Sequence, residues 1–199
     1  MAKTFNAKVK RSYKSPLAGD LTLYSVRLAA QDISNWQNAI NAAKSVINPR
    51  RKMLYTLYEN VMLDGHLSSV VEKREKRLTN KKIVFDIPNQ EGENVDWITE
   101  NVINTPWFYD LNKKACNKVA YGHALIELIP KNGLIHRVEE LDRINVRPED
   151  EFLQFSYASP HEGIYYKEDP YYSKYLIGFG GRKEYGKLMQ AAQYAIYKR

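Results

Sequence analysis

The sequence contains a single cysteine, Cys116, among its 199 residues. One cysteine cannot form a disulfide within the chain, so we expect a fold without disulfides and a reducing compartment such as the cytoplasm. No apolar run approaches the roughly 20 residues that a membrane-spanning helix needs. The N-terminus is basic but lacks the apolar segment of a secretory signal. The sequence therefore predicts a cytoplasmic chain without a membrane partner.

Motifs for catalysis and metal binding are also lacking. The four histidines show no i, i+4 spacing, and there is no H-E-x-x-H, C-x-x-C or G-x-S-x-G pattern. His123 and His136 could face each other across a hairpin, although a satisfied or exposed histidine is the ordinary interpretation of each. Nothing near Cys116 in the sequence would activate its thiol. We therefore predict no catalytic residue, no metal site, no cofactor and no enzymatic activity.

One glycine-rich stretch, Gly178 to Lys183, is a candidate phosphate-binding loop. It follows an expected strand and precedes an expected helix, where backbone N–H groups can cradle a phosphate. It lacks the Gly-Lys-Ser/Thr ending of a P-loop and the third glycine of a dinucleotide-binding loop. Glycine-rich turns without a ligand are common. A nucleotide-dependent enzyme is therefore the weakest of three hypotheses.

Positive charge exceeds negative charge, with a formal net charge of +7. A basic arm at residues 1–16 precedes the first acidic residue and is expected to be flexible by itself. A second group of cations is expected at the end of a helix. Neither aromatic platforms nor a nucleic-acid fold signature accompanies them, so only non-specific contacts with double-stranded DNA phosphates are expected. The candidate contact residues are Lys8, Lys10, Arg11, Lys14, Arg74, Arg77, Lys81 and Lys82.

The sequence pattern of the N-terminal half predicts helices. Apolar residues at spacings of three and four predict a helix over 32–47, with a face formed by Ile33, Trp36, Ile40, Ala43 and Ile47. A second helix is expected from about Arg50, and its stripe is Met53, Leu54, Leu57, Tyr58, Val61 and Met62. After Asp64-Gly65, a third helix is expected over 66–78 and then a short strand over 83–87. Two further helices follow, around 95–102 and over 106–121, the second with Thr105 as cap and a stripe of Phe108, Leu111, Ala115 and Val119.

The sequence pattern after residue 121 predicts mainly strands. Two runs, 123–129 and 134–139, flank Asn132-Gly133 and predict a β-hairpin. Further strands are expected at 144–147, 152–157 and 172–179, separated by Pro148, Pro160 and Pro170. A last helix is expected from about Lys183, with a face formed by Tyr185, Leu188, Ala192 and Ile196.

This order predicts an α+β fold in which N-terminal helices are followed by an antiparallel or mixed sheet and a C-terminal helix. We expect one domain over 17–199, helical at 32–121, strand-rich at 122–180 and ending in the helix at 183–199.

Several segments, taken in order, resemble the leading half of the Mu-like phage portal proteins. They are Asp32 to Trp36, Arg51 to Arg77, Ala120 to Glu127, Asn145 to Pro148, and Tyr185 to Leu188 with Ala192. The positions that carry the resemblance are expected to be structural: Trp36, Asp64, Arg74, Tyr121, Gly122, Glu127, Arg147, Pro148 and Gly186.

The resemblance implies a virion structural protein with the wing-like architecture of a portal, or head–tail connector. Such proteins form a ring, usually of twelve subunits, at one vertex of the phage head, after assembly in the host cytoplasm. Their partners are the terminase, the capsid and the neck or tail, and DNA passes through the ring during packaging and ejection.

Family members continue beyond the segment that resembles Tyr185 to Leu188, and the final helix here has no glycine or proline stop. We therefore expect a truncated portal subunit or a prophage remnant. The alternative is a non-specific nucleic-acid-binding accessory protein of a phage or mobile element.

Overall fold

The computed structural model describes residues 33–47, 49–81, 83–84, 93–156 and 159–198. The expected basic arm, Lys82 and residues 85–87 of the expected strand lie outside the described residues. Ile83 and Val84 are described and belong to no strand.

The helices are residues 33–43, α2 (Lys52–Met62), α3 (Gly65–Thr79), α4 (Glu93–Ile98), α5 (Pro106–Tyr121) and α6 (Leu188–Lys198). The short helix α4 continues directly into a π-helical turn, Thr99–Ile103. One sheet has the order β2-β1-β6, with β1 at Ala124–Lys131, β2 at Leu134–Glu140 and β6 at Leu176–Phe179. The other has the order β3-β4-β5, with β3 at Val146–Arg147, β4 at Phe152–Ser156 and β5 at Ser159–Tyr165. Among the described residues, no helix has the length and apolar character to cross a membrane.

The α+β prediction is confirmed, and every strand pair is antiparallel. The expected hairpin is also present: Asn132 and Gly133 have φ angles of 54° and 81°, the two positive values that a type I′ turn requires. The strands, however, form two small sheets rather than one. The sequence missed β5, because Pro160 looked like a strand breaker. Since β5 pairs only with β4, it is an edge strand, where proline is tolerated.

Two helix boundaries were predicted wrongly. The first helix ends at residue 43, and Ile47, expected on its buried face, is 97% exposed. The last helix begins at Leu188 rather than near Lys183. Gly186 has a φ of +75°, which breaks helical geometry, and Tyr185 packs on the core from a non-helical segment. The expected strand over 172–179 likewise starts with a 3-10 turn, Tyr172–Lys174, because Asp169 accepts hydrogen bonds from the backbone of the residues after Pro170.

Two predicted stripes also differ in detail from the buried faces. On α2 the buried side chains are Leu54, Tyr55, Tyr58 and Val61, whereas Met53 is half exposed. On α5 the buried residue is Ala120, and Val119 is half exposed. On α2 the buried side is wider than a single stripe because several elements converge on it, whereas on α5 only the last turn reaches the core cluster.

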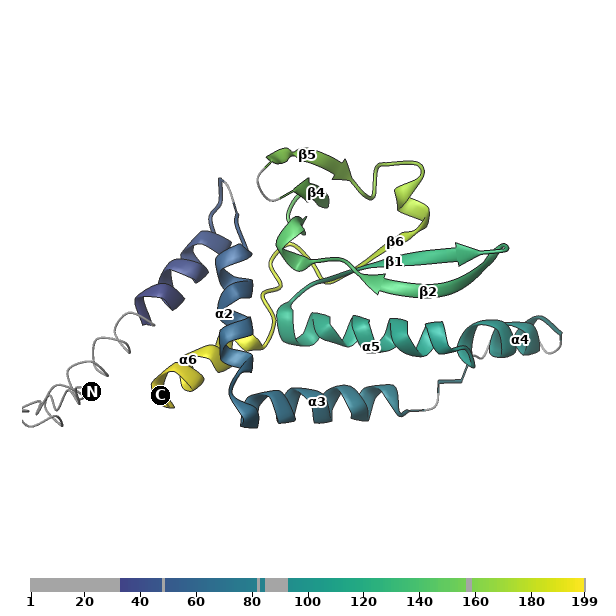
Figure 1. Ribbon diagram of the computed structural model, residues 1–199, viewed down its shortest axis with the longest axis horizontal. Helices are drawn as coiled ribbons and strands as arrows, with labels where there is room; N and C mark the ends of the chain where they lie inside the picture. Colours follow the sequence, from purple (N-terminus) through teal and green to yellow (C-terminus); the bar gives the residue numbers. More distant parts are fainter. Residues whose placement is uncertain (1–32, 48, 82, 85–92, 157–158, 199) are drawn as a thin grey trace, which may run out of the picture.

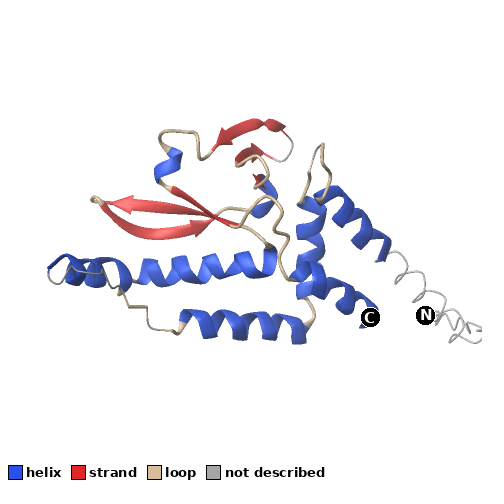
Figure 2. Cartoon of the chain, turned by 180° about the vertical axis from the view of Figure 1, so that it is seen from behind, coloured by secondary structure: helices blue, strands red, loops and turns tan. Residues whose placement is uncertain are grey.

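The long helices α3 and α5 lie side by side, and the β1–β2 hairpin covers the opposite side of α5 (Figures 1 and 2). At one end, α2 crosses these layers and packs against α6. The larger core cluster sits there, where the first helix, α2, α5 and α6 meet: Ala43, Leu54, Tyr55, Tyr58, Ala120 and Leu188. A second cluster joins the two sheets: Leu125, Val146, Tyr166 and Leu176.

Two backbone segments cross in contact where α5 ends and the chain approaches α6. Gly122, the left-handed cap of α5, has a φ of +87°. A Cβ atom on Gly122 would lie 2.6 Å from the nitrogen of Gly186, and one on Gly186 would lie 2.6 Å from the carbonyl carbon of Tyr121. The amide of Lys187 donates to the carbonyl of Val119 at 2.9 Å. We call this contact the glycine crossing, and no other residue type fits either position.

We predict that Gly122→Ala lowers the free energy of unfolding by about 3 kcal/mol or more, because it adds a steric clash to an unfavourable φ. The matched control is Gly133→Ala, whose φ is +81° but whose Cβ would meet no atom within 4 Å. That control should lose only the cost of the backbone conformation, about 1–2 kcal/mol. Urea denaturation of both variants checks the difference, and equal losses would contradict the steric argument.

Candidate functional site

A buried arginine joins three distant parts of the chain. Arg51 directly precedes α2 and is only 4% exposed. Its Nε donates to Oε1 of Glu149 at 2.7 Å. Its Nη1 donates to the carbonyl of Glu184 at 2.6 Å, and its Nη2 to those of Arg182 at 2.8 Å and Gly181 at 3.3 Å. The guanidinium also lies 4.9 Å from the centre of the Tyr185 ring.

This arrangement keeps the arginine charged although it is buried. Burial by itself would lower the pKa of Arg51, but Tyr55 and Glu149 outweigh it, so the pKa is raised. Charge-assisted hydrogen bonds to a carboxylate and to several carbonyls offset the loss of hydration. We call Arg51, Glu149 and the carbonyls of 181–184 the Arg51 node.

The node overturns the phosphate-cradle interpretation of Gly178 to Lys183. Carbonyl oxygens of this stretch point at a cation of the chain itself, whereas a phosphate needs backbone N–H groups. In addition, α6 begins five residues beyond Lys183, so no helix N-terminus adjoins the glycines. The nucleotide hypothesis therefore loses its structural basis.

Several positions that carried the portal resemblance surround the node. Gly122 and Gly186 form the glycine crossing, and Pro148 is buried beside Glu149. The ring of Tyr121 packs edge-on against Tyr58 at 6.0 Å, and Arg143 lies 4.0 Å from its centre. These four residues thus lie in packed surroundings, and their structural role in the family stays a prediction.

The remaining positions lie elsewhere. Asp64 caps α3 by accepting from the Leu67 amide at 2.9 Å, which lowers the pKa of its carboxyl, and it pairs with Lys198 at 3.2 Å. Arg147 lies 4.5 Å from the ring centre of Phe152. The other three are Trp36, partly buried beside a small cavity that Ile196 of α6 also lines, Glu127 in β1, and Arg74 on α3.

Sequence reasoning did not identify Arg51 as a special residue. Periodicity gave no reason to separate it from the adjacent Arg50, which is exposed. Its partners lie 98 to 133 residues away along the chain, so no local pattern could have revealed them.

We predict that Arg51→Met destabilises the protein by about 3–5 kcal/mol, because it leaves Glu149 and three carbonyls without their cation. Arg50→Met is the matched control, since it removes the same charge from an exposed neighbour, and should change stability by less than about 0.5 kcal/mol. Thermal and urea denaturation check both. Equal destabilisation by Arg51→Met and Arg50→Met would show that the contacts of Arg51 contribute nothing beyond its charge.

A buried histidine lies next to this region. His123 follows the glycine cap of α5 and is 1% exposed, and among the described residues its Nδ1 has no hydrogen-bond partner. Burial, aided by Arg51, Arg143 and Lys167, lowers the pKa of His123 to about 4. His123 does not face His136 across the hairpin, because His136 is exposed on β2 and β1 begins after His123. No group of three or more potential metal ligands occurs in the described part of the chain.

We predict that acid destabilises the protein through His123. Between about pH 6.5 and about pH 4, the unfolded chain binds this proton and the folded chain does not. As the pH is lowered through this window, the free energy of unfolding should therefore fall by about 1.4 kcal/mol for each pH unit. His123→Gln should flatten the profile, whereas His136→Gln at an exposed site should leave it unchanged. Urea titrations at several pH values measure this, and a wild-type slope retained by His123→Gln would contradict it.

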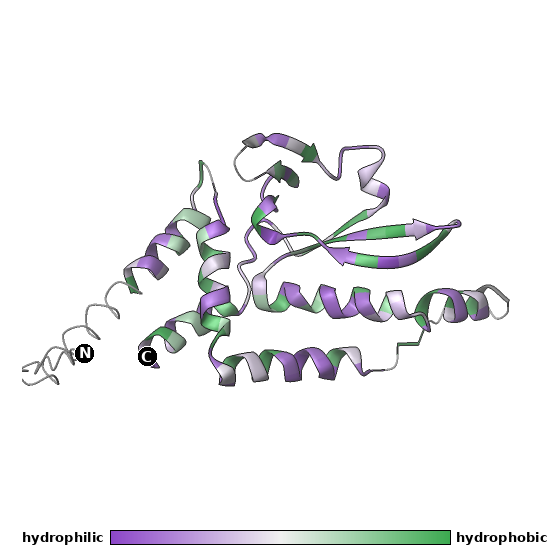
Figure 3. Cartoon of the chain, viewed as in Figure 1, coloured by the Kyte–Doolittle hydropathy of each residue, from purple (hydrophilic) through white to green (hydrophobic). Residues whose placement is uncertain are grey.

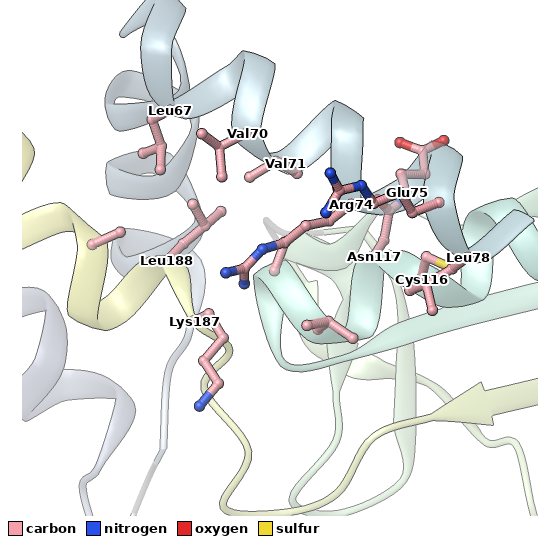
Figure 4. Close-up of a pocket in the computed structure, with 14 residues that line it drawn as sticks. Leu67, Val70, Val71, Arg74, Glu75, Leu78, Cys116, Asn117, Lys187 and Leu188 are labelled. Atoms are coloured by element: carbon pink, nitrogen blue, oxygen red, sulfur yellow. The ribbon is translucent and has the colours of Figure 1, made fainter.

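An apolar groove opens between α3, α5 and the start of α6 (Figure 4). Its volume is about 440 Å³. Leu67, Val70 and Val71 project from α3 toward Leu188 of α6, and Cys116 lies on the α5 side. Partial burial raises the pKa of the Cys116 thiol, which argues against a reactive thiolate. Although α3 carries an apolar stripe, it has no fully buried residue.

The structure places only some of the expected DNA contacts. Arg74 and Arg77 line the groove, together with Lys187, which sequence reasoning did not select. Lys81 is exposed just beyond α3. Lys8, Lys10, Arg11, Lys14 and Lys82 lie outside the described residues. Contact between these cations and DNA remains a prediction.

Comparison with known proteins identifies a family. The sequence matches the family model described as the portal protein of Mu bacteriophage over residues 55–199. No curated protein and no solved structure matches the chain. The matched span contains both sheets, α3 to α6 and the glycine crossing. It covers well over half of the sequence, so the chain belongs to the family of Mu bacteriophage portal proteins.

Proposed function

We propose that this chain is part of a portal subunit and contributes to a ring through which phage DNA is packaged and ejected. The observation that carries the proposal is the family match over residues 55–199. The family is structural rather than enzymatic. The ring would stand at a vertex of the capsid, after assembly in the host cytoplasm.

The exposed surface of the chain supports a role in assembly. Large hydrophobic side chains remain exposed over several separate elements: Val46, Ile47, Trp97, Phe155, Tyr194 and Tyr197. Such side chains, aromatic ones especially, are typical of protein interfaces. Subunits of a ring contact one another through two different patches, and apolar surface on several sides of one chain suits that geometry.

The partners follow from this role. We propose about twelve copies per ring, with the terminase, the capsid and the neck or tail as neighbours. Duplex DNA would pass without base-specific contacts, because tight contacts would hinder its movement. Arg74 and Arg77, which form no ion pair with the described residues, suit weak, non-specific phosphate contacts.

We predict that the protein, expressed with any sequence that its gene adds beyond Arg199, forms rings with a central hole. Negative-stain imaging shows the hole, and mass photometry gives the number of subunits. A strictly monomeric protein at high concentration would contradict the proposal. A monomer whose DNA affinity disappears when Lys8, Lys10, Arg11 and Lys14 are neutralised would favour the accessory-protein alternative instead.

A further inference from the structure

The groove between α3, α5 and α6 has an apolar floor and a basic rim. Three cations line it, Arg74, Arg77 and Lys187, against one carboxylate, Glu75. Glu75 already lies 3.7 Å from Lys113 of α5. Within the residues that the structure describes, none of the three cations has an acidic partner. Hydropathy colouring shows the same division along α3, with apolar residues in its first half and charged ones in its second (Figure 3).

A segment of opposite charge lies at the other end of the molecule. Residues 93–103, which form α4 and the π-helical turn, contain Glu93, Asp96 and Glu100 and no basic residue. Asp96 and Glu100 are exposed, and between them the Trp97 side chain is 54% exposed. Among the described elements, this acidic helix packs appreciably only against α5, through the π-helical turn.

The acidic helix and the groove of one chain are too far apart to meet. The helix adjoins the beginning of α5, whereas the groove contains Cys116 to Ala120 near its end. Even Cys116, the groove residue nearest the beginning of α5, lies ten helical steps from Pro106, which corresponds to about 15 Å. Figure 1 shows α4 projecting past the beginning of α5, away from α6. Contact between the two surfaces therefore requires two copies of the chain.

We propose that the acidic helix of one copy docks into the groove of a neighbouring copy. This inference rests on the proposed function, because it names the surfaces through which portal subunits would touch. Trp97 enters the apolar floor, and the carboxylates of Asp96 and Glu100 pair with the cations at the rim. The two patches differ, so the contact is head-to-tail and can repeat around a ring.

The chemistry of the two surfaces matches. A buried tryptophan removes 150–250 Å² of surface from water and is a frequent hot spot of interfaces. The opposite charges set register and raise the association rate, and salt weakens their attraction.

Cys116 provides a direct test, because it lies in the groove and is the only cysteine of the sequence. Asn101→Cys places a second thiol one helical turn after Trp97 and leaves Trp97, Asp96 and Glu100 intact. A short bismaleimide, applied at mildly alkaline pH, should join position 101 of one copy to Cys116 of another. Peptide mass spectrometry identifies the linked pair. His161→Cys, at an exposed site on β5, is the matched control and should give no specific link to Cys116.

Charge reversal gives a second measurement. Arg74→Glu with Arg77→Glu should reduce the 101–116 link about tenfold. Adding Asp96→Lys and Glu100→Lys to the same chain should restore it. A mere structural defect in α3 would not be rescued in this way.

The outcomes separate this inference from the proposed function. Equal linking of positions 101 and 161 to Cys116, or no rescue by the reversed charges, overturns the docking even if rings form. A 101–116 link without rings supports the docking and contradicts the ring. If duplex DNA shields Cys116 from an alkylating reagent, DNA occupies the groove and the proposal is overturned. If Cys116 is shielded only while residues 1–32 are present, the N-terminal segment occupies the groove and the proposal is likewise overturned.

Discussion

The buried guanidinium of Arg51 is the interaction on which the arrangement of this chain depends. It joins the start of α2, the loop that carries Glu149 and the segment that leads into α6. A buried cation is tolerated only when its partners converge on it. Here the carbonyls of 181–184 converge because the glycine crossing fixes this segment against the end of α5. The node and the crossing therefore support each other: neither geometry is favourable without the other.

This dependence divides the molecule into two unlike ends. At one end lie the node, the crossing, buried His123 and the larger core cluster. At the other end α4 packs, among the described elements, appreciably only against α5. The helix α3 runs from the core cluster toward that end and has no fully buried residue. A subunit of an assembly needs both, because a rigid end holds surfaces in position and an open end offers apolar surface to neighbours. The chain belongs to a family of portal proteins, for which a division of this kind is suited to assembly.

Local sequence signals predicted those elements that local forces determine. Apolar spacing gave α2, α3 and α5, Thr105-Pro106 gave the start of α5, and Asn132-Gly133 gave the hairpin. Several of the errors involve distant partners. Tyr185 fits a helical stripe, but it packs against the core from a non-helical segment, which Gly186 and the carbonyl of Val119 hold in place. For the same reason Arg51 could not be recognised, nor could the groove, whose walls come from α3, α5 and α6. The portal family was recognised because its segments recur in order, and the match over 55–199 confirms it.

Arginine at position 51 also determines how the segment before α6 packs against the start of α2. An apolar side chain there would pack against many positions of the segment before α6, since the hydrophobic effect has no direction. The planar guanidinium instead donates along fixed directions and is satisfied only when particular carbonyls face it. Shifting the 181–186 segment by one residue would turn those carbonyls away and leave a buried charge unpaired. Such a shift would also move Leu188, Ala192 and Ile196 from the core face of α6. The register of α6 is therefore fixed by a polar contact that precedes the helix, and its apolar face stabilises the register that this contact selects.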